Sequence, residues 1–521
     1  MKISKLFLST LAALAVMVGC SEEPMSVQSV EPQSVEANIQ AEGMMQFGPQ
    51  LTNPYALANM QQAYANITGA KAQLQPTHLY VRFLPRDEYE LQVLRRDTTL
   101  ELFDFPLDHE IVGSGTHYHD PELPADAITW QYCAVPANYA FPESIHYEVL
   151  EQLFLPEVLD GAKSDLADRL DDEALRLAGY AVEGPSDGSK ARKRFKPSGR
   201  ITVHDNTLDA IVGIHGLRVI ARSWFTTKHA FTDANGDFLI DHTFKGHCNY
   251  WIKWERADFD IRSGNWGQAW CDGPRLDGRW DHTFHLGSVQ WQYAHIFRAA
   301  HMYYYGNDRW GIKTPPKASG ILKRCLHIGA MDKDGTSHYF EFNKFFTTPQ
   351  IKVFCKRSNG IERQSRYIYG TTIHELAHAS HWEMCYSYGQ YVLDFIANSA
   401  KIPESWASCV EHVITSDIYN MPHENLQDKQ LSDFRWPADE RGYTPLFIDC
   451  IDTYNQRDWG GSRCPIDRVS GYTLSQIESA IKYGANDTTD SGYKGIIKGL
   501  RRYDNPTHIY LEELFGNYRN L

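Results

Sequence analysis

The stretch Gly370-Thr-Thr-Ile-His374-Glu375-Leu-Ala-His378-Ala-Ser-His381-Trp382 decides how the second half of the chain is interpreted. We expect a helix over residues 371–386, on which His374 and His378 are one turn apart and point the same way. Two imidazoles in this arrangement can bind one zinc ion. Glu375 lies beside His374, where a carboxylate can accept a proton from metal-activated water.

A second interpretation of the same stretch needs no metal. Thr372 and Glu375 have the spacing of a helix capping box, in which case the two histidines would be solvated. The flanking residues favour the metal site, because Ile373, Leu376 and Ala377 are apolar, as a buried active-site helix requires.

Catalytic zinc has three protein ligands and one open position, so a third ligand must come from elsewhere in the chain. We assign it to Glu404, which lies in the first turn of a helix expected over residues 403–419. Two rivals remain. Glu411 lies on the same helix face as Glu404 and would be a ligand or the partner of one, and His381 lies on the face of His378.

The pattern His374-Glu375-x-x-His378, followed by Glu404-x-x-Ala407 on a later helix, resembles the gluzincin metallopeptidases. The resemblance covers residues 290–420. It implies zinc held by two histidines and Glu404, with Glu375 as the general base, and hydrolysis of peptide bonds in a protein or peptide substrate. The chain departs from that family in its longer spacing to Glu404 and in Ser408, where some members have Asp.

Such enzymes often use a downstream Tyr or His to stabilise the oxyanion. The candidates here are His412, Tyr419, His423 and Tyr443, and the sequence does not choose among them.

The N-terminus is typical of a secreted protein. Two lysines precede the apolar run Leu6–Val18, which is too short to span a bilayer, and Gly19-Cys20 follows. This order resembles the lipobox of bacterial lipoproteins, which implies a lipid on Cys20 and contact with the membrane through it. An ordinary cleaved signal is the alternative. The acidic pair Glu22-Glu23 resembles a surface-export signal, so we expect an outer-membrane lipoprotein exposed at the cell surface, with the periplasmic face as the alternative.

The middle of the chain has strand-like segments throughout residues 201–262, with a hairpin signal at Thr232-Asp-Ala-Asn-Gly-Asp-Phe238. Their order resembles the carboxypeptidase regulatory-like β-sandwich, usually a non-catalytic accessory. Nearer the N-terminus we expect a helix over residues 53–67, a strand over 78–83 and a helix over 147–155. Nearer the C-terminus we expect helices over residues 289–305 and 474–483.

Composition limits the remaining possibilities. Of the 521 residues, 42% are hydrophobic and 22% charged, which is ordinary for a globular protein, and a net charge of −14 argues against nucleic acid as a partner. We expect a multidomain α+β protein. Its expected segments are a signal peptide (1–19), a flexible tether (20–45), a mixed N-terminal domain (46–182), a linker (183–200), the β-sandwich (201–265) and a zincin-like α+β catalytic domain (270–521).

Two functions from different classes fit this organisation. The favoured one is a zinc-dependent metallopeptidase anchored to the bacterial envelope by lipid. The alternative is a non-catalytic surface lipoprotein that binds glycan or protein on an inactive zincin scaffold. Because two histidines, a base and a candidate third ligand are all present, the sequence favours the enzyme.

Overall fold

The computed structural model describes residues 43–70, 73–159, 164–180, 193–265, 267–315, 317, 325–340, 348–384, 401–421, 444–455, 457–458, 465–486 and 492–519. Within these residues the chain has a mixed α+β fold with many antiparallel strands, as expected. The predicted signal peptide, Cys20 and most of the predicted tether and linker lie outside the described residues. None of the described helices is both long and apolar enough to cross a membrane.

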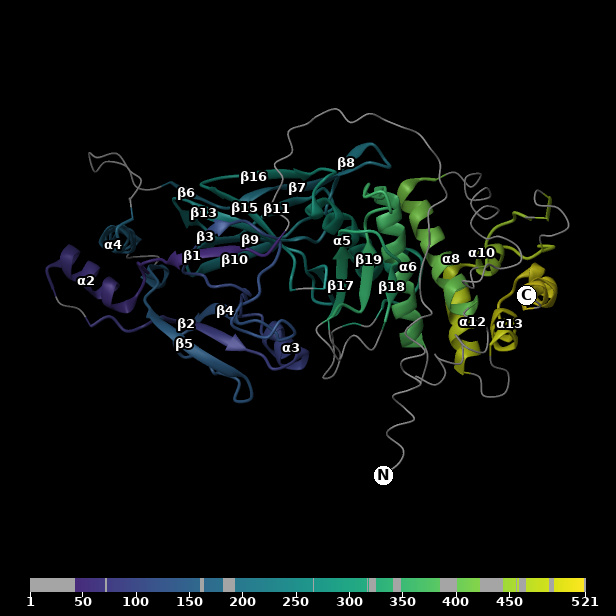
Figure 1. Ribbon diagram of the computed structural model, residues 1–521, viewed down its shortest axis with the longest axis horizontal. Helices are drawn as coiled ribbons and strands as arrows, with labels where there is room; N and C mark the ends of the chain where they lie inside the picture. Colours follow the sequence, from purple (N-terminus) through teal and green to yellow (C-terminus); the bar gives the residue numbers. More distant parts are fainter. Residues whose placement is uncertain are drawn as a thin grey trace, which may run out of the picture.

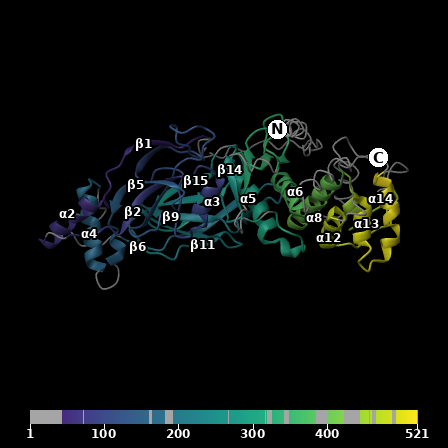
Figure 2. The ribbon, with the colours of Figure 1, turned by 90° about the horizontal axis from the view of Figure 1, so that it is seen from below.

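The sheets and helices are spread along the long axis of the molecule (Figures 1 and 2). Helix α2 (Leu57–Thr68) lies at one end, and α13 (Tyr493–Leu500) and α14 (Leu511–Arg519) lie at the other. Between them come the strands of the first half of the chain and then the helices that carry the predicted metal site.

The N-terminal region contains an antiparallel sheet of order β4-β2-β5. Its central strand β2 (His78–Leu84) matches the predicted strand, and β4 (Gln131–Pro136) pairs with one of its edges. Helix α3 (Glu88–Arg96) follows β2 and is capped at its N-terminus by Asp87, whose side chain accepts from the backbone N–H of Glu90.

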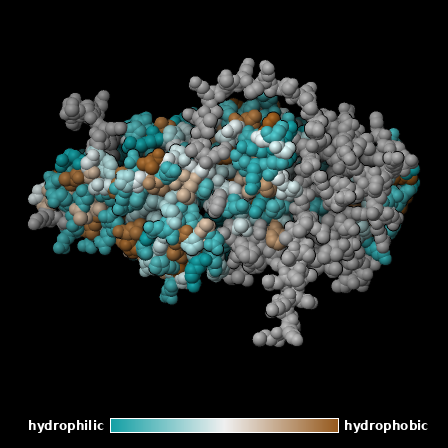
Figure 3. Space-filling view, in the orientation of Figure 1, coloured by the Kyte–Doolittle hydropathy of each residue, from teal (hydrophilic) through white to brown (hydrophobic). Residues whose placement is uncertain are grey.

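The helix predicted over residues 147–155 was wrong, since this segment forms strand β5 (His146–Leu153) and pairs with β2 along its length. Tyr147, Val149 and Leu150 are exposed on it, so its apolar residues do not alternate between an inner and an outer face. Figure 3 shows hydrophobic surface in this area. Without alternation, the spacing of apolar residues was indistinguishable from that of a helix.

Two sheets pack face to face in the middle of the chain. One has the order β10-β9-β13-β15, and the other has the order β11-β7-β16 with β8 (Ala210–Gly213) also paired to β7. Aromatic side chains join them, with the ring of Tyr250 in contact with those of Phe238 and Trp280. The strands are β7 (Ser198–Asp205), β9 (Arg218–Ser223), β10 (Thr226–Phe231), β11 (Asp237–Leu239), β13 (Cys248–Lys253), β15 (Trp270–Leu276) and β16 (Trp280–Phe284).

The first of these sheets is buried on both faces. Along β13, Tyr250 and Ile252 point into the core shared with the second sheet, while Trp251 points the other way. That opposite face, with Ile220 and Trp270, packs against the hydrophobic core of the N-terminal region. The N-terminal region and the two-sheet unit are therefore joined by a continuous apolar interface.

The predicted hairpin at residues 232–238 forms a turn but not a hairpin. The Asp233 carboxylate accepts from the backbone N–H groups of Asn235 and Asp237, and Gly236 takes the left-handed conformation with φ +85°. The flanking strands β10 and β11 belong to different sheets, so the turn carries the chain from one sheet to the other.

One strand from the middle of the chain belongs to a different sheet, which is formed mainly by the C-terminal region. Strand β14 (Phe259–Ser263) pairs in parallel with β17 (Leu326–Met331), which pairs in turn with β19 (Ile351–Phe354) and through it with β18 (His338–Tyr339). After β14 the chain returns to form β15 and β16. The two-sheet unit thus extends to residue 284, beyond the expected boundary at residue 265.

Three helices build the framework of the C-terminal region. Helix α5 (Val289–Tyr305) has the predicted bounds, α6 (Ser365–Met384) carries the two metal-site histidines, and α8 (Lys401–Tyr419) carries Glu404. Helix α6 packs against both α5 and α8. Helix α12 (Leu474–Asn486) begins where predicted.

The loop after β7 caps the N-terminus of α6. The side chain of Asn206 accepts from the backbone N–H of Ser365 at 2.8 Å, and the hydroxyl of Thr207 accepts from that of Arg366 at 3.3 Å. The hydroxyl of Ser365 donates to the buried carboxylate of Asp205. Because these groups satisfy N–H donors that a helix leaves open, the two-sheet unit fixes where α6 begins.

Candidate metal centre

The candidate centre lies between α6 and α8. Helix α6 begins nine residues before His374, so Thr372 is inside the helix, and its hydroxyl donates to the backbone carbonyl of Ile368 at 2.7 Å. The capping-box interpretation is therefore excluded. His374, His378 and Glu404 are all buried, with exposed fractions of 2%, 0% and 2%.

Three side-chain atoms converge in this buried space. Nε2 of His374 lies 3.2 Å from Nε2 of His378, and Oε2 of Glu404 lies 3.3 Å from the first and 3.4 Å from the second. The structure thus brings together the three residues assigned from the sequence as metal ligands, and they form a group that could hold a metal ion.

The spacing of these atoms fits a tetrahedral ion. Ligand atoms that lie about 2.0–2.1 Å from a tetrahedral zinc ion are separated by about 3.3 Å from one another. The observed distances of 3.2–3.4 Å agree with this value. Two imidazoles and one carboxylate also leave a fourth position open, as catalytic zinc sites do.

Glu404 is held in its ionised form. Burial alone would raise the pKa of its carboxyl group, but His378 and His374 outweigh burial and lower that pKa to about 2. An anionic ligand between two imidazoles is well suited to a divalent cation.

Glu411 is not a member of this group, because it contacts the other side of the His374 ring. Its Oε2 lies 3.1 Å from Nδ1 of His374, whereas Nε2, the other ring nitrogen, faces Glu404 and His378. A carboxylate there fixes the tautomer with a proton on Nδ1 and leaves Nε2 free for a metal. Of the two roles considered from the sequence, the geometry supports that of a partner to a ligand.

Gly370 makes room for Glu411. A Cβ atom at position 370 would lie 2.8 Å from Oε1 of Glu411, closer than side chains tolerate. Sequence reasoning missed this residue, because the helix was expected to begin only at residue 371, whereas the observed helix already includes Gly370.

The remaining rival for the third ligand position and the four candidates for oxyanion stabilisation lie in different places. His381 is buried on α6, but among the described residues it is not part of the converging group. The ring of Tyr419 packs against that of Tyr369, about 22 Å along α8 from Glu404, which is too far to serve the site. His412 is buried on α8, and His423 and Tyr443 lie outside the described residues.

Glu375, the predicted general base, is fully buried on α6 next to His374. Its burial matches the apolar flanks noted in the sequence, and a carboxylate in such a place is withheld from bulk water.

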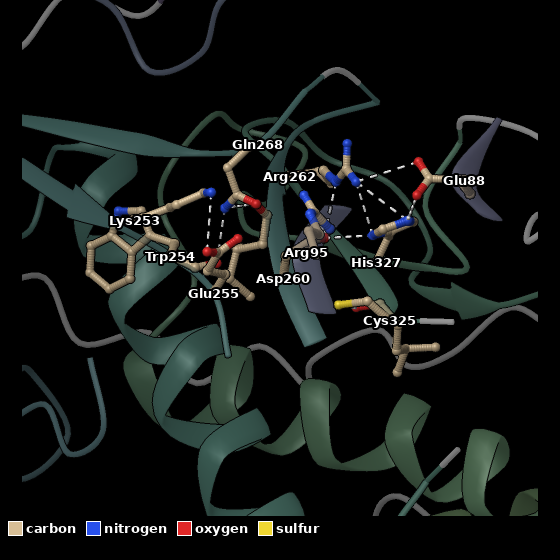
Figure 4. Close-up of polar contacts among 12 residues, drawn as sticks. Glu88, Arg95, Lys253, Trp254, Glu255, Asp260, Arg262, Gln268, Cys325 and His327 are labelled. Atoms are coloured by element: carbon tan, nitrogen blue, oxygen red, sulfur yellow. Dashed lines mark hydrogen bonds and ion pairs between the residues drawn. The ribbon is translucent and has the colours of Figure 1, made fainter. Parts of the chain in front are cut away.

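A second buried group of metal-ligand types consists of Asp260, Cys325 and His327. Figure 4 shows that Arg95 and Arg262 surround it. Each guanidinium pairs with Asp260 at 3.0 Å, and Nδ1 of His327 lies 2.7 Å from the same carboxylate. Two adjacent cations already neutralise this carboxylate, so the group is better explained as a buried ion-pair network than as a metal site.

No family model matches this chain, and neither the curated proteins nor the solved structures contain a match to it.

Proposed function

We propose that the chain is a zinc metallopeptidase of the gluzincin type. The observation that carries the proposal is the convergence of two imidazole nitrogens and one carboxylate oxygen at mutual distances of 3.2–3.4 Å in a buried space between two helices. The same three residues stand in the motif order that this type of enzyme uses.

Each residue has a defined part. His374, His378 and Glu404 would hold the zinc ion, which when bound supplies a Lewis acid for a scissile carbonyl and lowers the pKa of water. Glu375 would accept a proton from the attacking water and pass it to the leaving amine. Glu411 would keep the ring of His374 in the orientation and tautomer that binding needs.

Zinc content tests the ligand assignment. We expect purified wild-type protein to contain stoichiometric zinc and Glu404→Ala to lose it, while His381→Ala and Glu411→Ala retain bound zinc at saturating metal. If Glu404 only stabilised the N-terminal turn of α8, its removal would cost about 0.3–1 kcal/mol and leave the metal bound. A zinc-loaded Glu404→Ala protein would therefore overturn this assignment. Metal analysis also separates zinc from Fe(II), which uses the same ligand types on other folds.

Turnover tests the reaction. Glu375→Gln should keep its zinc and lower kcat by at least about 10²-fold, the usual contribution of a general base. Glu383, exposed on the same helix, gives the matched control Glu383→Gln, which should be as active as wild type. If the zinc-loaded wild type cleaves peptides no faster than Glu375→Gln, the non-catalytic binding protein becomes the better description.

The proposal includes a lipid anchor at Cys20, supported by the order of basic, apolar and small residues before it. In a bacterial host that lipidates such sequences, the wild type should partition into detergent and Cys20→Ala into the aqueous phase. Aqueous partitioning of both proteins would contradict the anchor and the outer-membrane location derived from it.

A further inference from the structure

Strand β5 forms one edge of the sheet β4-β2-β5, and Figure 1 shows it on the outer side of β2. Among the described residues β2 is its only ladder partner, and one further bridge, between Leu153 and Ala56, covers the end of the strand. A strand paired on one side turns half of its backbone N–H and C=O groups outward, where they can pair with another strand. Lysine and proline usually protect such an edge, and β5 contains neither.

The opposite edge of this sheet is covered by the chain itself. The backbone N–H of Phe103 donates to the carbonyl of Tyr132 at 2.9 Å, and that of Tyr132 donates to the carbonyl of Phe103 at 2.6 Å. Joining two copies by their β5 edges therefore uses the open edge of each. Such pairing gives a closed dimer and not a growing fibre.

One face of the β5 edge is apolar. Tyr147 lies opposite Phe83 of β2, and Val149 lies opposite Val81, so the apolar face of the sheet continues to its edge. Tyr147 and Val149 are 39% and 47% exposed. The ring of Phe141 stacks on that of Tyr147, with 4.0 Å between the ring centres. A partner strand with apolar side chains on this face would bury surface that now faces water.

The other face of the same edge carries charged groups. Glu148 lies opposite Arg82 of β2, and its carboxylate pairs with that guanidinium at 2.7 Å. His146 is exposed on this face, with its Nε2 3.7 Å from the Glu148 carboxylate. The alternation between the faces stops at Leu150, which the pairing with β2 skips. The segment that suits a partner strand thus ends before Leu150.

We propose that β5 pairs antiparallel with β5 of a second copy of this chain, with Tyr147 on the two-fold axis. In this register each His146 faces Glu148 of the other copy, and its imidazole N–H donates to that carboxylate. Glu148 then lies between Arg82 of its own copy and His146 of the other. The apolar faces of the two sheets also become continuous across the axis.

The neighbouring registers are less favourable. An axis at Glu148 would place the two carboxylates opposite each other, which is destabilising. An axis at Val149 would oppose Glu148 to Leu150 and extend the ladder to Leu153, where Ala56 already occupies the edge. A shift by a single residue would turn the charged face of one copy toward the apolar face of the other. The matched charges thus favour a second copy over an unrelated extended peptide.

Sedimentation velocity of the full chain at total concentrations from about 1 to about 100 μM tests for the dimer. Because the contact is small, we expect a weak dimer that dissociates on dilution, without larger species. A monomer at every concentration would overturn the inference. Species that continue to grow with concentration would do so too, since the sheet has only one edge to offer.

Disulfide cross-linking tests the register. Directly opposed residues of an antiparallel pair have Cα atoms about 4.5–5.5 Å apart, within the reach of a disulfide, so Tyr147→Cys should form a covalent dimer under mild oxidation. Val149→Cys is the matched control, because its two copies would lie about 13 Å apart. Wild type treated in the same way accounts for the native cysteines. Cross-linking of Val149→Cys without that of Tyr147→Cys would contradict the proposed axis.

Charge exchange tests the pairs beside the axis. Glu148→Lys should raise the dissociation constant of the dimer about tenfold, because it places a cation opposite His146 of the other copy. Adding His146→Glu should restore dimerisation, which would not follow if Glu148 only supported the fold. Glu110→Lys, the same change at an exposed position of strand β3 (His109–Gly113), is the matched control and should dimerise as wild type does.

Far-ultraviolet circular dichroism confirms that each variant is folded. Undiminished dimerisation of folded Glu148→Lys, or equal losses in Glu148→Lys and in the double variant, would show that the copies meet through another surface. The peptidase proposal does not depend on any of these results.

Discussion

Oε2 of Glu411 lies 3.1 Å from Nδ1 of His374, on the ring nitrogen that does not face His378 and Glu404. The hydrogen bond between Glu411 and His374 places the ring proton on Nδ1, so the metal-facing Nε2 keeps its lone pair. A residue on one helix thereby determines which nitrogen a residue on another helix offers to a metal.

Glu411→Ala should weaken zinc binding by about 10–100-fold without abolishing it, because a metal-bound histidine that loses its carboxylate partner also loses its fixed orientation. Glu411→Gln should weaken it less, since the amide oxygen can still accept from Nδ1. Competition with a chelator of known affinity measures both. Equal affinities for wild type and Glu411→Ala would show that the contact does not orient His374.

Gly370→Ala should reproduce the zinc affinity of Glu411→Ala, because the added Cβ would displace the carboxylate that it would otherwise meet at 2.8 Å. The fold should survive, since the displaced atom is the end of a flexible side chain and alanine favours a helix by about 0.5–1 kcal/mol over glycine.

The double variant Gly370→Ala/Glu411→Ala provides the control for that prediction. Its zinc affinity should equal that of Glu411→Ala alone, because both changes remove one interaction. Additive losses in the double variant would show that Gly370 acts on the metal centre by another route.

Asp205→Asn should destabilise the protein by about 3–5 kcal/mol, because it leaves the guanidinium of Arg298 buried without its counter-charge. That pair has an N–O distance of 2.8 Å, and Asp205 is fully buried. Chemical denaturation measures the loss. The control Asp209→Asn lies on the same loop, at an exposed side chain, and should change the free energy of unfolding by less than about 0.5 kcal/mol.

His327→Gln should cost more stability at pH 6 than at pH 9. Burial and then Arg262 lower the pKa of His327, but Asp260 and Glu88 outweigh them and raise it above its usual value. When the pKa is raised in the folded state, the protonated histidine stabilises the fold. This contribution is fully present below the unfolded pKa of about 6.5 and is lost as the pH rises through the folded pKa.

Denaturant titrations at the two pH values test this dependence. His146→Gln, which changes an exposed histidine at the start of β5, should show the same small effect at both. A larger penalty for His327→Gln at pH 9 would contradict the sign of the pKa shift.

Local sequence patterns were sufficient for the central part of the site. The spacing of His374 and His378 depends only on helix geometry, and Glu404 stands in the first turn of α8 as predicted. Helix α5 has its predicted bounds because Ser288 caps it and Gly306 ends it. In each case the deciding contacts lie within a few residues of one another.

Contacts between distant segments could not be predicted in the same way. The function of Glu411 depends on a histidine 37 residues away, and the cap on α6 comes from residues about 160 positions earlier. The prediction for the segment that forms β5 was wrong for a related reason, since its exposed apolar residues do not alternate with polar ones in the way that marks a strand.

The path of β14 means that the C-terminal region of this chain is not a self-contained module. The chain adds this strand to the C-terminal sheet and then goes back to complete the two-sheet unit before α5 begins. A cut near residue 268 would deprive one part of an edge strand and the other of β15 and β16. Domain grafting or recombination at that point would yield two incomplete pieces, so the two-sheet unit and the C-terminal region must be inherited together.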